Sequence, residues 1–328
     1  MSTPVALVTG YLGSGKTTLI RALLRSPALG ETAVIVNELG EIGIDHAILR
    51  QVDERTVLLA SGCVCCTLRG DLADELRDLV DRRASGELPP FTRVVVETTG
   101  VADPAPILAT LVSEPLVRHQ YALESVIATV DAQHGLRGAE AERQVAAADV
   151  LVVTKGDLAD PTGVEQALGA LNPVASVVRA VQGDVDPALL LGGREGACVE
   201  STRASSPHRA EGHRHADEVA AVSLVLGGPV DWLGFGVWLT MLLHARGREI
   251  LRIKGLLDVG GEGPLLVDAV QHVVHPPVHL DAWPDDDRRS RLVLIGRHLD
   301  SERVERSLRS FVARAQYDLG MPRTCWPT

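Results

Sequence analysis

A glycine-rich loop near the start of the chain has the residues and spacing of a phosphate-binding site. The motif Gly10-x-x-x-x-Gly15-Lys16-Thr17 follows an apolar run at residues 5–8 and precedes a stretch with helical periodicity. Glycines let the backbone approach a phosphate closely, and the amino end of the following helix carries partial positive charge. Lys16 supplies an ammonium group for the phosphates, and the Thr17 hydroxyl suits Mg²⁺. We predict a P-loop whose nucleotide contacts are Gly10, Gly13, Ser14, Gly15, Lys16, Thr17 and Thr18.

Two further polar motifs follow apolar runs and complete the pattern of a nucleotide site. Glu97-Thr98-Thr99-Gly100 offers an acid for Mg²⁺ and a glycine N–H for the γ-phosphate. Thr154-Lys155-x-Asp157 fits a guanine reader, because a carboxylate accepts from both the N1–H and the N2 amine of guanine while the lysine stem packs over the base. Alone this tetrapeptide is a common surface turn. After a P-loop and an acid-x-x-Gly motif it favours GTP over ATP.

Three cysteines within four positions indicate a soft metal site. Cys63, Cys65 and Cys66 could bind a tetrahedral ion such as Zn²⁺, with one further histidine, carboxylate or water. In an extended chain Cys66 would face away from the other two, so joint ligation requires a turn, which Gly62 makes feasible. The alternative is three buried thiols that act as small hydrophobes. A redox pair is less well supported, because the spacing is not Cys-x-x-Cys.

The composition restricts the class of protein. The 328 residues carry a net charge of -11 with 3% aromatic residues, which argues against a nucleic-acid surface. The first apolar run is already the strand before the P-loop and has no basic residues ahead of it, so we expect no signal peptide. The later apolar stretch 232–243 is too short to span a membrane. Five cysteines without a disulfide-like spacing predict a reduced, cytoplasmic protein.

The surrounding pattern predicts an α/β fold of two domains. Apolar runs that alternate with amphipathic helices indicate a mostly parallel sheet covered on both faces, with ligands at the carboxyl ends of its strands. The polar motifs should therefore converge on one edge. We expect a P-loop domain at 1–191, a histidine-containing linker at 192–217 and a smaller α+β domain at 218–328. In the linker His208, His213 and His215 either collect a metal or are polar filler.

The individual elements are expected as follows. In the first domain we predict strands at 5–8, 33–36, 56–60, 93–96, 126–130 and 150–153, with helices at 15–25, after Asp160-Pro161, and around an apolar face of Leu68, Leu72, Leu76, Leu79 and Val80. In the second domain we predict strands at 219–226, 250–259, 264–274 and 290–296, with helices at 230–245 and 301–315. His272, His275 and His279 lie near these strands and are expected to be structural, since Pro276 and Pro277 interrupt regular ligand geometry.

Taken in order, the motifs resemble those of CobW-type metallochaperone GTPases. The segments are GYLGSGKTT (10–18), NELGEIGID (37–45), GCVCCT (62–67), ETTGVADP (97–104) and TKGD (154–157), and RIKGLLDV (252–259) and LVLIGRHLD (292–300) are similar to the CobW carboxyl-terminal domain. The resemblance implies a GTP-hydrolysing protein that delivers zinc, or in some branches cobalt, to client metalloproteins. The chain departs from the pattern at Thr154, where the family usually has asparagine, and in its short run of linker histidines.

The resemblance also implies roles for individual residues. The catalytic set is Lys16, Glu38, Glu41 and Glu97, and Gly100, Thr154, Lys155 and Asp157 join the P-loop in binding GTP. The metal set is Cys63, Cys65 and Cys66 with Glu41 for Zn²⁺ or Co²⁺, and Thr17 and Glu97 for Mg²⁺. Apart from the resemblance, the His-x-His spacing adds His213 and His215 as metal ligands if the linker collects an ion. Intrinsic turnover should be slow, because no clear arginine finger or water-orienting glutamine is evident.

Other functions remain open from the sequence. One alternative is a cobalt chaperone linked to cobalamin synthesis, although three thiolates favour Zn²⁺. A second is a metal-sensing switch whose output is a protein contact, and a third is an ATP-dependent small-molecule kinase. No nucleic-acid or membrane partner is expected, and a homodimer is an option that the sequence does not decide.

Overall fold

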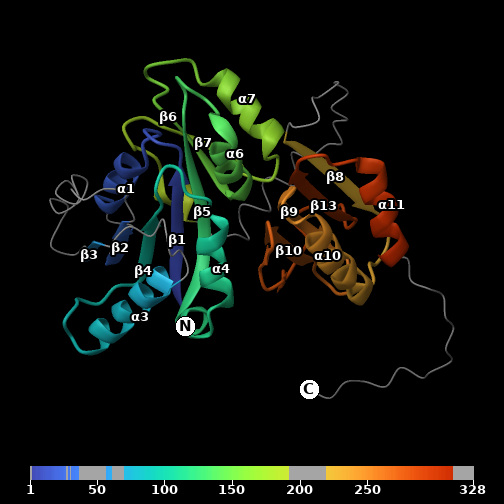
Figure 1. Cartoon of the computed structure of the whole chain (residues 1–328), viewed down its shortest axis with the longest axis horizontal. Helices are drawn as coiled ribbons and strands as arrows, with labels where there is room; N and C mark the ends of the chain where they lie inside the picture. Colours follow the sequence, from blue (N-terminus) through green and yellow to red (C-terminus); the bar gives the residue numbers. More distant parts are fainter. Residues whose placement is uncertain are drawn as a thin grey trace.

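The computed structural model describes residues 2–26, 29, 31–36, 57–60, 70–191 and 219–312 (Figure 1). Loop 37–43, the cysteine motif and linker 192–217 lie outside these residues. The described residues form two domains, each built on one sheet. In Figure 1 the first domain runs from blue to yellow-green and the second from orange to red.

The first domain contains a seven-stranded parallel sheet with the order β3-β2-β4-β1-β5-β6-β7. Its strands are β1 (Thr3–Gly10), β2 (Thr32–Val36), β3 (Val57–Ala60), β4 (Arg93–Glu97), β5 (Tyr121–Asp131), β6 (Val150–Thr154) and β7 (Ser176–Ala180). The predicted parallel α/β sheet is thereby confirmed. Strand β7 was not predicted, because it lies at an edge of the sheet and its burial alternates instead of forming a continuous apolar run.

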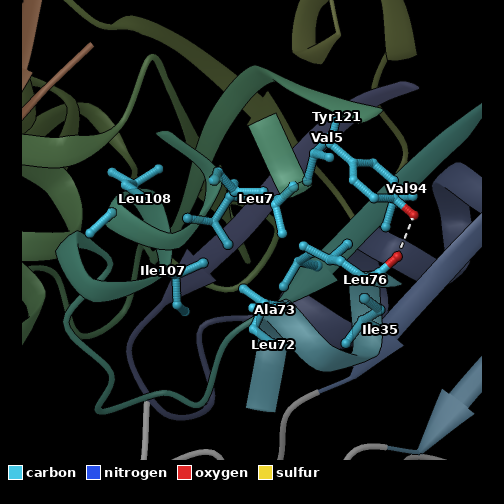
Figure 2. Packing of buried hydrophobic residues seen from close by; sticks show 14 of the residues in the cluster. Val5, Leu7, Ile35, Leu72, Ala73, Leu76, Val94, Ile107, Leu108 and Tyr121 are labelled. Atoms are coloured by element: carbon cyan, nitrogen blue, oxygen red, sulfur yellow. Dashed lines mark hydrogen bonds between the residues drawn. The ribbon is translucent and has the colours of Figure 1, made fainter. Parts of the chain in front are cut away.

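Helices cover both faces of this sheet. They are α1 (Lys16–Leu24), α3 (Gly70–Ala84), α4 (Ala105–Ser113), α5 (Pro115–Gln120), α6 (Gly138–Ala147), α7 (Thr162–Leu171) and α8 (Pro187–Leu190). Successive side chains of β1 point to opposite faces: Ala6 and Val8 pack with α1 and α8, whereas Val5 and Leu7 pack with α3 and α4. Figure 2 shows the second cluster, in which the buried Tyr121 hydroxyl donates to the Leu76 carbonyl over 2.9 Å.

The second domain is an antiparallel sheet with the order β11-β10-β9-β13-β8, and β12 pairs with β10. Its elements are β8 (Ala220–Leu226), α10 (Trp232–Arg246), β9 (Ile250–Leu257), β10 (Leu265–Val270), β11 (Val273–Val274), β12 (Val278–His279), β13 (Ser290–Gly296) and α11 (Ser301–Val312). One face packs on α10 and α11. The single strand predicted at 264–274 is wrong: a turn at Gln271 (φ 51°) separates β10 from β11, which pair as a hairpin.

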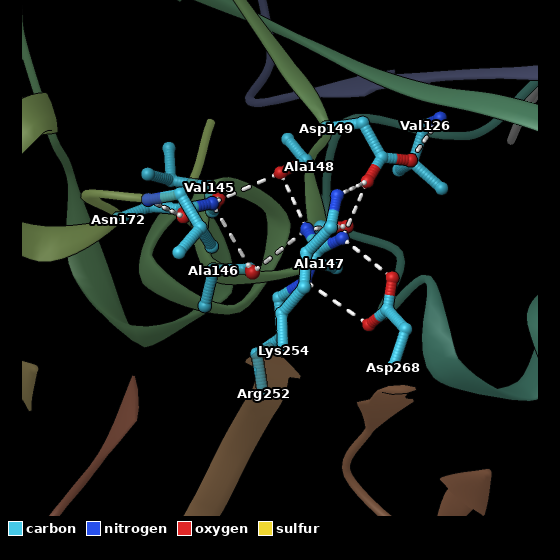
Figure 3. Close-up of polar contacts among 11 residues, drawn as sticks. Val126, Val145, Ala146, Ala147, Ala148, Asp149, Asn172, Arg252, Lys254 and Asp268 are labelled. Carbon is cyan, nitrogen blue, oxygen red and sulfur yellow. Dashed lines mark hydrogen bonds and ion pairs between the residues drawn. The ribbon is translucent and has the colours of Figure 1, made fainter. Parts of the chain in front are cut away.

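The other face of the second sheet packs on the first domain. Leu251, Val293 and Ile295 join a buried cluster with residues of α6 and α7. Beside it lies a fully buried polar network, defined here as Asp149, Arg252, Lys254 and Asp268 (Figure 3). Arg252 also donates to the carbonyls of Ala147 and Ala148 at the end of α6. The two domains therefore share both an apolar and an ionic contact.

Candidate nucleotide-binding site

The loop between β1 and α1 has the backbone of a phosphate cradle. Gly10, Gly13 and Gly15 have φ values of 138°, 73° and 98°, the left-handed region that the sequence predicts for them. A Cβ atom at Gly10 would also lie 2.3 Å from Oγ1 of Thr129, so the loop has no room for a side chain there. Gly15 is the N-cap of α1, which directs the amino end of that helix into the loop.

Polar side chains of the P-loop brace it from within. Lys16 is 8% exposed, and its Nζ donates to the carbonyl oxygens of Gly10 (2.8 Å) and Tyr11 (3.2 Å). These two hydrogen bonds hold the ammonium group at the concave side of the loop, where phosphates would bind. The buried Ser14 hydroxyl forms a 2.6 Å hydrogen bond with Thr129 of β5. Thr18 follows on the first turn of α1 and is exposed.

Thr17 and Glu97 meet beside this loop. Glu97 ends β4 and is 5% exposed, and its Oε1 accepts a 2.8 Å hydrogen bond from the Thr17 hydroxyl. A hydroxyl and a carboxylate are both hard oxygen donors, the type that Mg²⁺ takes while it keeps several waters and phosphate oxygens. The donor set of Thr17 and Glu97 therefore fits Mg²⁺.

The loop after β4 packs directly on the P-loop. A Cβ atom at Gly100 would lie 2.6 Å from the backbone nitrogen of Leu12, so only glycine allows this approach. Gln144 of α6, which is 1% exposed, donates through Nε2 to the carbonyls of Gly100 (3.1 Å) and Ala102 (3.0 Å). Sequence reasoning missed Gln144, because α6 itself was not predicted and no motif surrounds this residue.

Thr154 links the predicted base-reading loop to the P-loop. Its hydroxyl donates to the Ser14 carbonyl over 2.7 Å and also reaches the Val130 carbonyl at 3.3 Å. A threonine hydroxyl thus makes the bridge between the two loops without the amide that the family pattern has here. Lys155 follows with φ 57°, and Asp157 is exposed, available to a ligand.

Asp131, at the end of β5, fixes Lys155. Its Oδ2 lies 2.6 Å from Lys155 Nζ and 2.8 Å from His134 Nδ1, and its Oδ1 accepts from the Gln133 backbone at 2.7 Å. Burial alone would raise the pKa of Asp131, but the hydrogen bonds from Lys155, His134 and Gln133 outweigh it and lower the pKa to about 2. Asp131 directly follows the strand predicted at 126–130, and no motif in the sequence gives it a role.

Replacing Asp131 with asparagine is expected to destabilise the protein in a pH-dependent way. A carboxylate whose pKa is depressed on folding stabilises above its unfolded pKa of 3.8, and this contribution is lost as the pH falls toward about 2. The difference in urea midpoint between wild type and Asp131→Asn should therefore be full at pH 5 and fade between pH ~4 and ~2. A difference that stays constant across this range would contradict the assignment.

Several predicted site residues lie outside the described residues. They are Glu38, Glu41, Cys63, Cys65, Cys66, His208, His213 and His215. The described strands do fix where two of these segments leave the sheet. Val36 at the end of β2 is the register partner both of Ala60 at the end of β3 and of Glu97. The strands that lead into loop 37–43, into the cysteine motif and into the residues after Glu97 therefore end side by side at one edge of the sheet.

The described residues contain neither a cluster of metal-ligating side chains nor a membrane-spanning helix. No group of three or more histidine, cysteine, aspartate or glutamate residues that could hold a metal occurs in those ranges. The buried His275, expected to be structural, donates its backbone N–H to the Asp268 carbonyl over 3.0 Å. In the same part of the chain, no helix has the length and apolarity required to cross a membrane.

Comparison with known proteins places this architecture in a family. Residues 4–179 match the model of the CobW/HypB/UreG nucleotide-binding domain. The chain belongs to the CobW/HypB/UreG family. Residues 219–312 match the carboxyl-terminal domain of the cobalamin synthesis protein cobW, so the resemblance drawn from the motifs is confirmed for both domains. Every described residue of the candidate site lies within residues 4–179, the range that matches the nucleotide-binding domain.

Individual relatives of this CobW-family chain are similar over nearly their whole length. The zinc chaperone YjiA of Escherichia coli is 34% identical over 309 residues, covering 92% of this chain and 96% of the relative. The zinc chaperone CobW of Pseudomonas aeruginosa is 32% identical, and the match covers 94% of this chain and 92% of the relative. The crystal structure of Zn(II)-bound YjiA GTPase from E. coli superposes with a TM-score of 0.68 at 27% identity, covering 95% and 99% of the two chains. The chain is thus homologous to zinc chaperones that include a named GTPase.

Proposed function

We propose that this protein is a GTPase that binds zinc through its cysteine motif in a nucleotide-dependent way and transfers the ion to client metalloproteins. The observation that carries the proposal is the common exit of three segments from the sheet, where Val36, Ala60 and Glu97 are register neighbours. A nucleotide-dependent change at Glu97 would act at the same edge of the sheet as the end of β3, the strand that leads to the cysteine motif. Homology to zinc chaperones supports the identity of the ion.

In this proposal the described residues bind and orient GTP. Lys16 and the backbone amides of the P-loop hold the phosphates, and Asp157 with the Lys155 stem reads guanine. Thr17 and Glu97 hold Mg²⁺, which neutralises phosphate charge when bound. Gly100 presents its N–H to the γ-phosphate. The Thr17 hydroxyl donates to Glu97 Oε1, so the two proposed ion ligands lie within hydrogen-bond distance of each other.

The proposed coupling of nucleotide and metal is modest in energy. A γ-phosphate with Mg²⁺ would bias loop 37–43, which contains Glu38 and Glu41, and the strand before this loop ends beside the strand that leads to the cysteine motif. A roughly 100-fold difference in zinc affinity between the GTP and GDP states requires about 2.8 kcal/mol, which one or two gained ligands can supply. Cys63, Cys65 and Cys66, with Glu41 and the linker histidines His213 and His215, are the proposed ligands.

A competition titration with Zn²⁺ and Co²⁺ tests this proposal. The purified apo-protein is titrated with each ion in the presence of Mg²⁺ with a GTP analogue, and separately with Mg²⁺–GDP. We expect zinc to bind roughly 100-fold more tightly in the GTP state, and the tight phase to be lost in Cys65→Ala. Cys198→Ala and Cys325→Ala remove thiols outside the motif and serve as matched controls. Equal zinc affinity in both nucleotide states would contradict the coupling.

The titration, together with assays of zinc transfer, nucleotide competition and GTP turnover, separates the alternatives. Tight binding of cobalt instead of zinc would indicate a cobalt chaperone. Normal titrations without transfer of zinc to an apo-metalloenzyme would favour a metal-sensing switch. If ATP competes as well as GTP for the site and Cys65→Ala has no effect on turnover, a small-molecule kinase becomes the better explanation.

A further inference from the structure

The turn between β10 and β11 of the second domain reaches the Gly100 loop, defined here as residues 98–103. Nε2 of Gln271 donates to both carboxylate oxygens of Asp103, at 3.0 Å to Oδ1 and 2.8 Å to Oδ2. Gln271 has a left-handed φ of 51°, and its backbone N–H donates to the Leu251 carbonyl of β9 over 3.0 Å. The turn is thereby anchored to its own sheet while its side chain contacts the first domain.

Asp103 is the point at which this loop enters α4. Its Oδ1 accepts from the Ala105 backbone N–H at 3.0 Å, and Arg143 Nε lies 3.3 Å from its Oδ2. The neighbouring residue on α6, Gln144, holds the carbonyls of Gly100 and Ala102. The loop is therefore held by α6 along its length and by Gln271 at its end.

We propose that Gln271 is a positioning residue for GTP hydrolysis, acting through Asp103 on the backbone of Gly100. This inference rests on the proposed GTPase function. The Gly100 backbone lies against Leu12, so its place relative to the phosphates depends on how the loop is anchored. Displacements of about 1 Å at a catalytic group can cost roughly 10²-fold in rate. The second domain thus contributes directly to the geometry of the nucleotide site.

The test compares three variants of Gln271 in single-turnover and steady-state GTP hydrolysis. Gln271→Met keeps the length of the side chain and removes the amide donor, and we expect kcat to fall roughly tenfold while the KM for GTP changes less than about twofold. Gln271→Glu places a second carboxylate against Asp103 and should lower kcat further. The double variant Gln271→Glu with Asp103→Asn restores the hydrogen bond with its direction reversed, because position 103 then carries the amide donor and position 271 the carboxylate acceptor. This double variant should recover most of the rate.

Stability measurements and a neighbouring variant complete the design. Val274 lies on the same hairpin and its side chain is 44% exposed. The control variant Val274→Thr should therefore leave kcat unchanged. If Gln271→Met lowers the thermal midpoint but keeps the wild-type kcat, the contact only docks the domains and the inference is overturned. The inference would also be overturned if the double variant Gln271→Glu with Asp103→Asn had a kcat no higher than that of Gln271→Glu alone. Absence of GTP turnover in the wild type would overturn both this role and the proposed function, whereas turnover unaffected by Gln271 overturns this role alone.

Discussion

Replacement of Lys16 by methionine is expected to lower kcat/KM for GTP by roughly 10²–10³-fold. Its ammonium group is the one cation that the described P-loop residues, 10–18, place inside the loop, bonded to the carbonyls of Gly10 and Tyr11. These carbonyl bonds hold the group beside the phosphate cradle, so it can move to the β- and γ-phosphates over a short distance. Methionine fills a similar volume without the charge.

The matched control for Lys16 is Arg25→Met at the other end of α1. Arg25 is the exposed C-cap of the helix, so this variant also removes one cation from the same element. Single-turnover hydrolysis at saturating Mg²⁺–GTP, with nucleotide affinity measured separately, distinguishes loss of binding from loss of the chemical step. Wild-type turnover in Lys16→Met would show that the phosphates bind elsewhere and would refute the P-loop assignment.

Local sequence signals were sufficient to predict the P-loop and the edge of the sheet where ligands would bind. The glycines at 10, 13 and 15 needed positive φ, and they have it. The polar motifs follow apolar runs that become β4 and β6, so parallel pairing brings Glu97 and Thr154 to the same edge as Gly10. These features depend on residues that are close in sequence, which is why the spacing was informative.

The contacts that support the site could not be predicted in the same way. Thr129, Gln144 and Gln271 act on loops that are distant in sequence, and none belongs to a recognisable motif. The turn at Gln271 was also missed, since Gln271 and His272 lie between apolar residues and contain neither glycine nor proline. Which residues face the P-loop is decided by the packing of α6 and of the second domain, and this packing has no local sequence signal.

The largest predicted effect on stability comes from Arg252→Met. Arg252 is 1% exposed and its guanidinium contacts Asp149 (2.5 Å) and Asp268 (3.0 Å), while Lys254 contacts Asp149 at 2.9 Å. Burial alone would lower the pKa of Arg252, but the carboxylates of Asp268 and Asp149 outweigh it, and the pKa is raised. The network contains two cations and two carboxylates, so it is neutral as a whole. Removing Arg252 leaves one buried negative charge uncompensated.

Breaking such a buried network by removing one partner costs about 3–5 kcal/mol, and we expect this loss in the unfolding free energy of Arg252→Met. The carbonyls of Ala147 and Ala148 at the end of α6 also lose their donor. A control is Arg297→Met, which breaks the partly exposed contact between Arg297 and Glu142 of the first domain and should cost at most ~1 kcal/mol. Urea unfolding monitored by tryptophan fluorescence reports on the second half of the chain, which contains all four tryptophans.

The double variant Arg252→Met with Asp268→Asn separates charge from packing. If the cost arises from an uncompensated carboxylate, neutralising Asp268 should recover part of the stability lost in the single variant, because the remaining pair of Asp149 and Lys254 is balanced. If the double variant is instead less stable than Arg252→Met, the loss comes from the hydrogen bonds and volume of Arg252. Since Arg252 joins β9 to the end of α6, and α6 carries Gln144, a loosened network should also reduce GTP turnover, although less than Lys16→Met does.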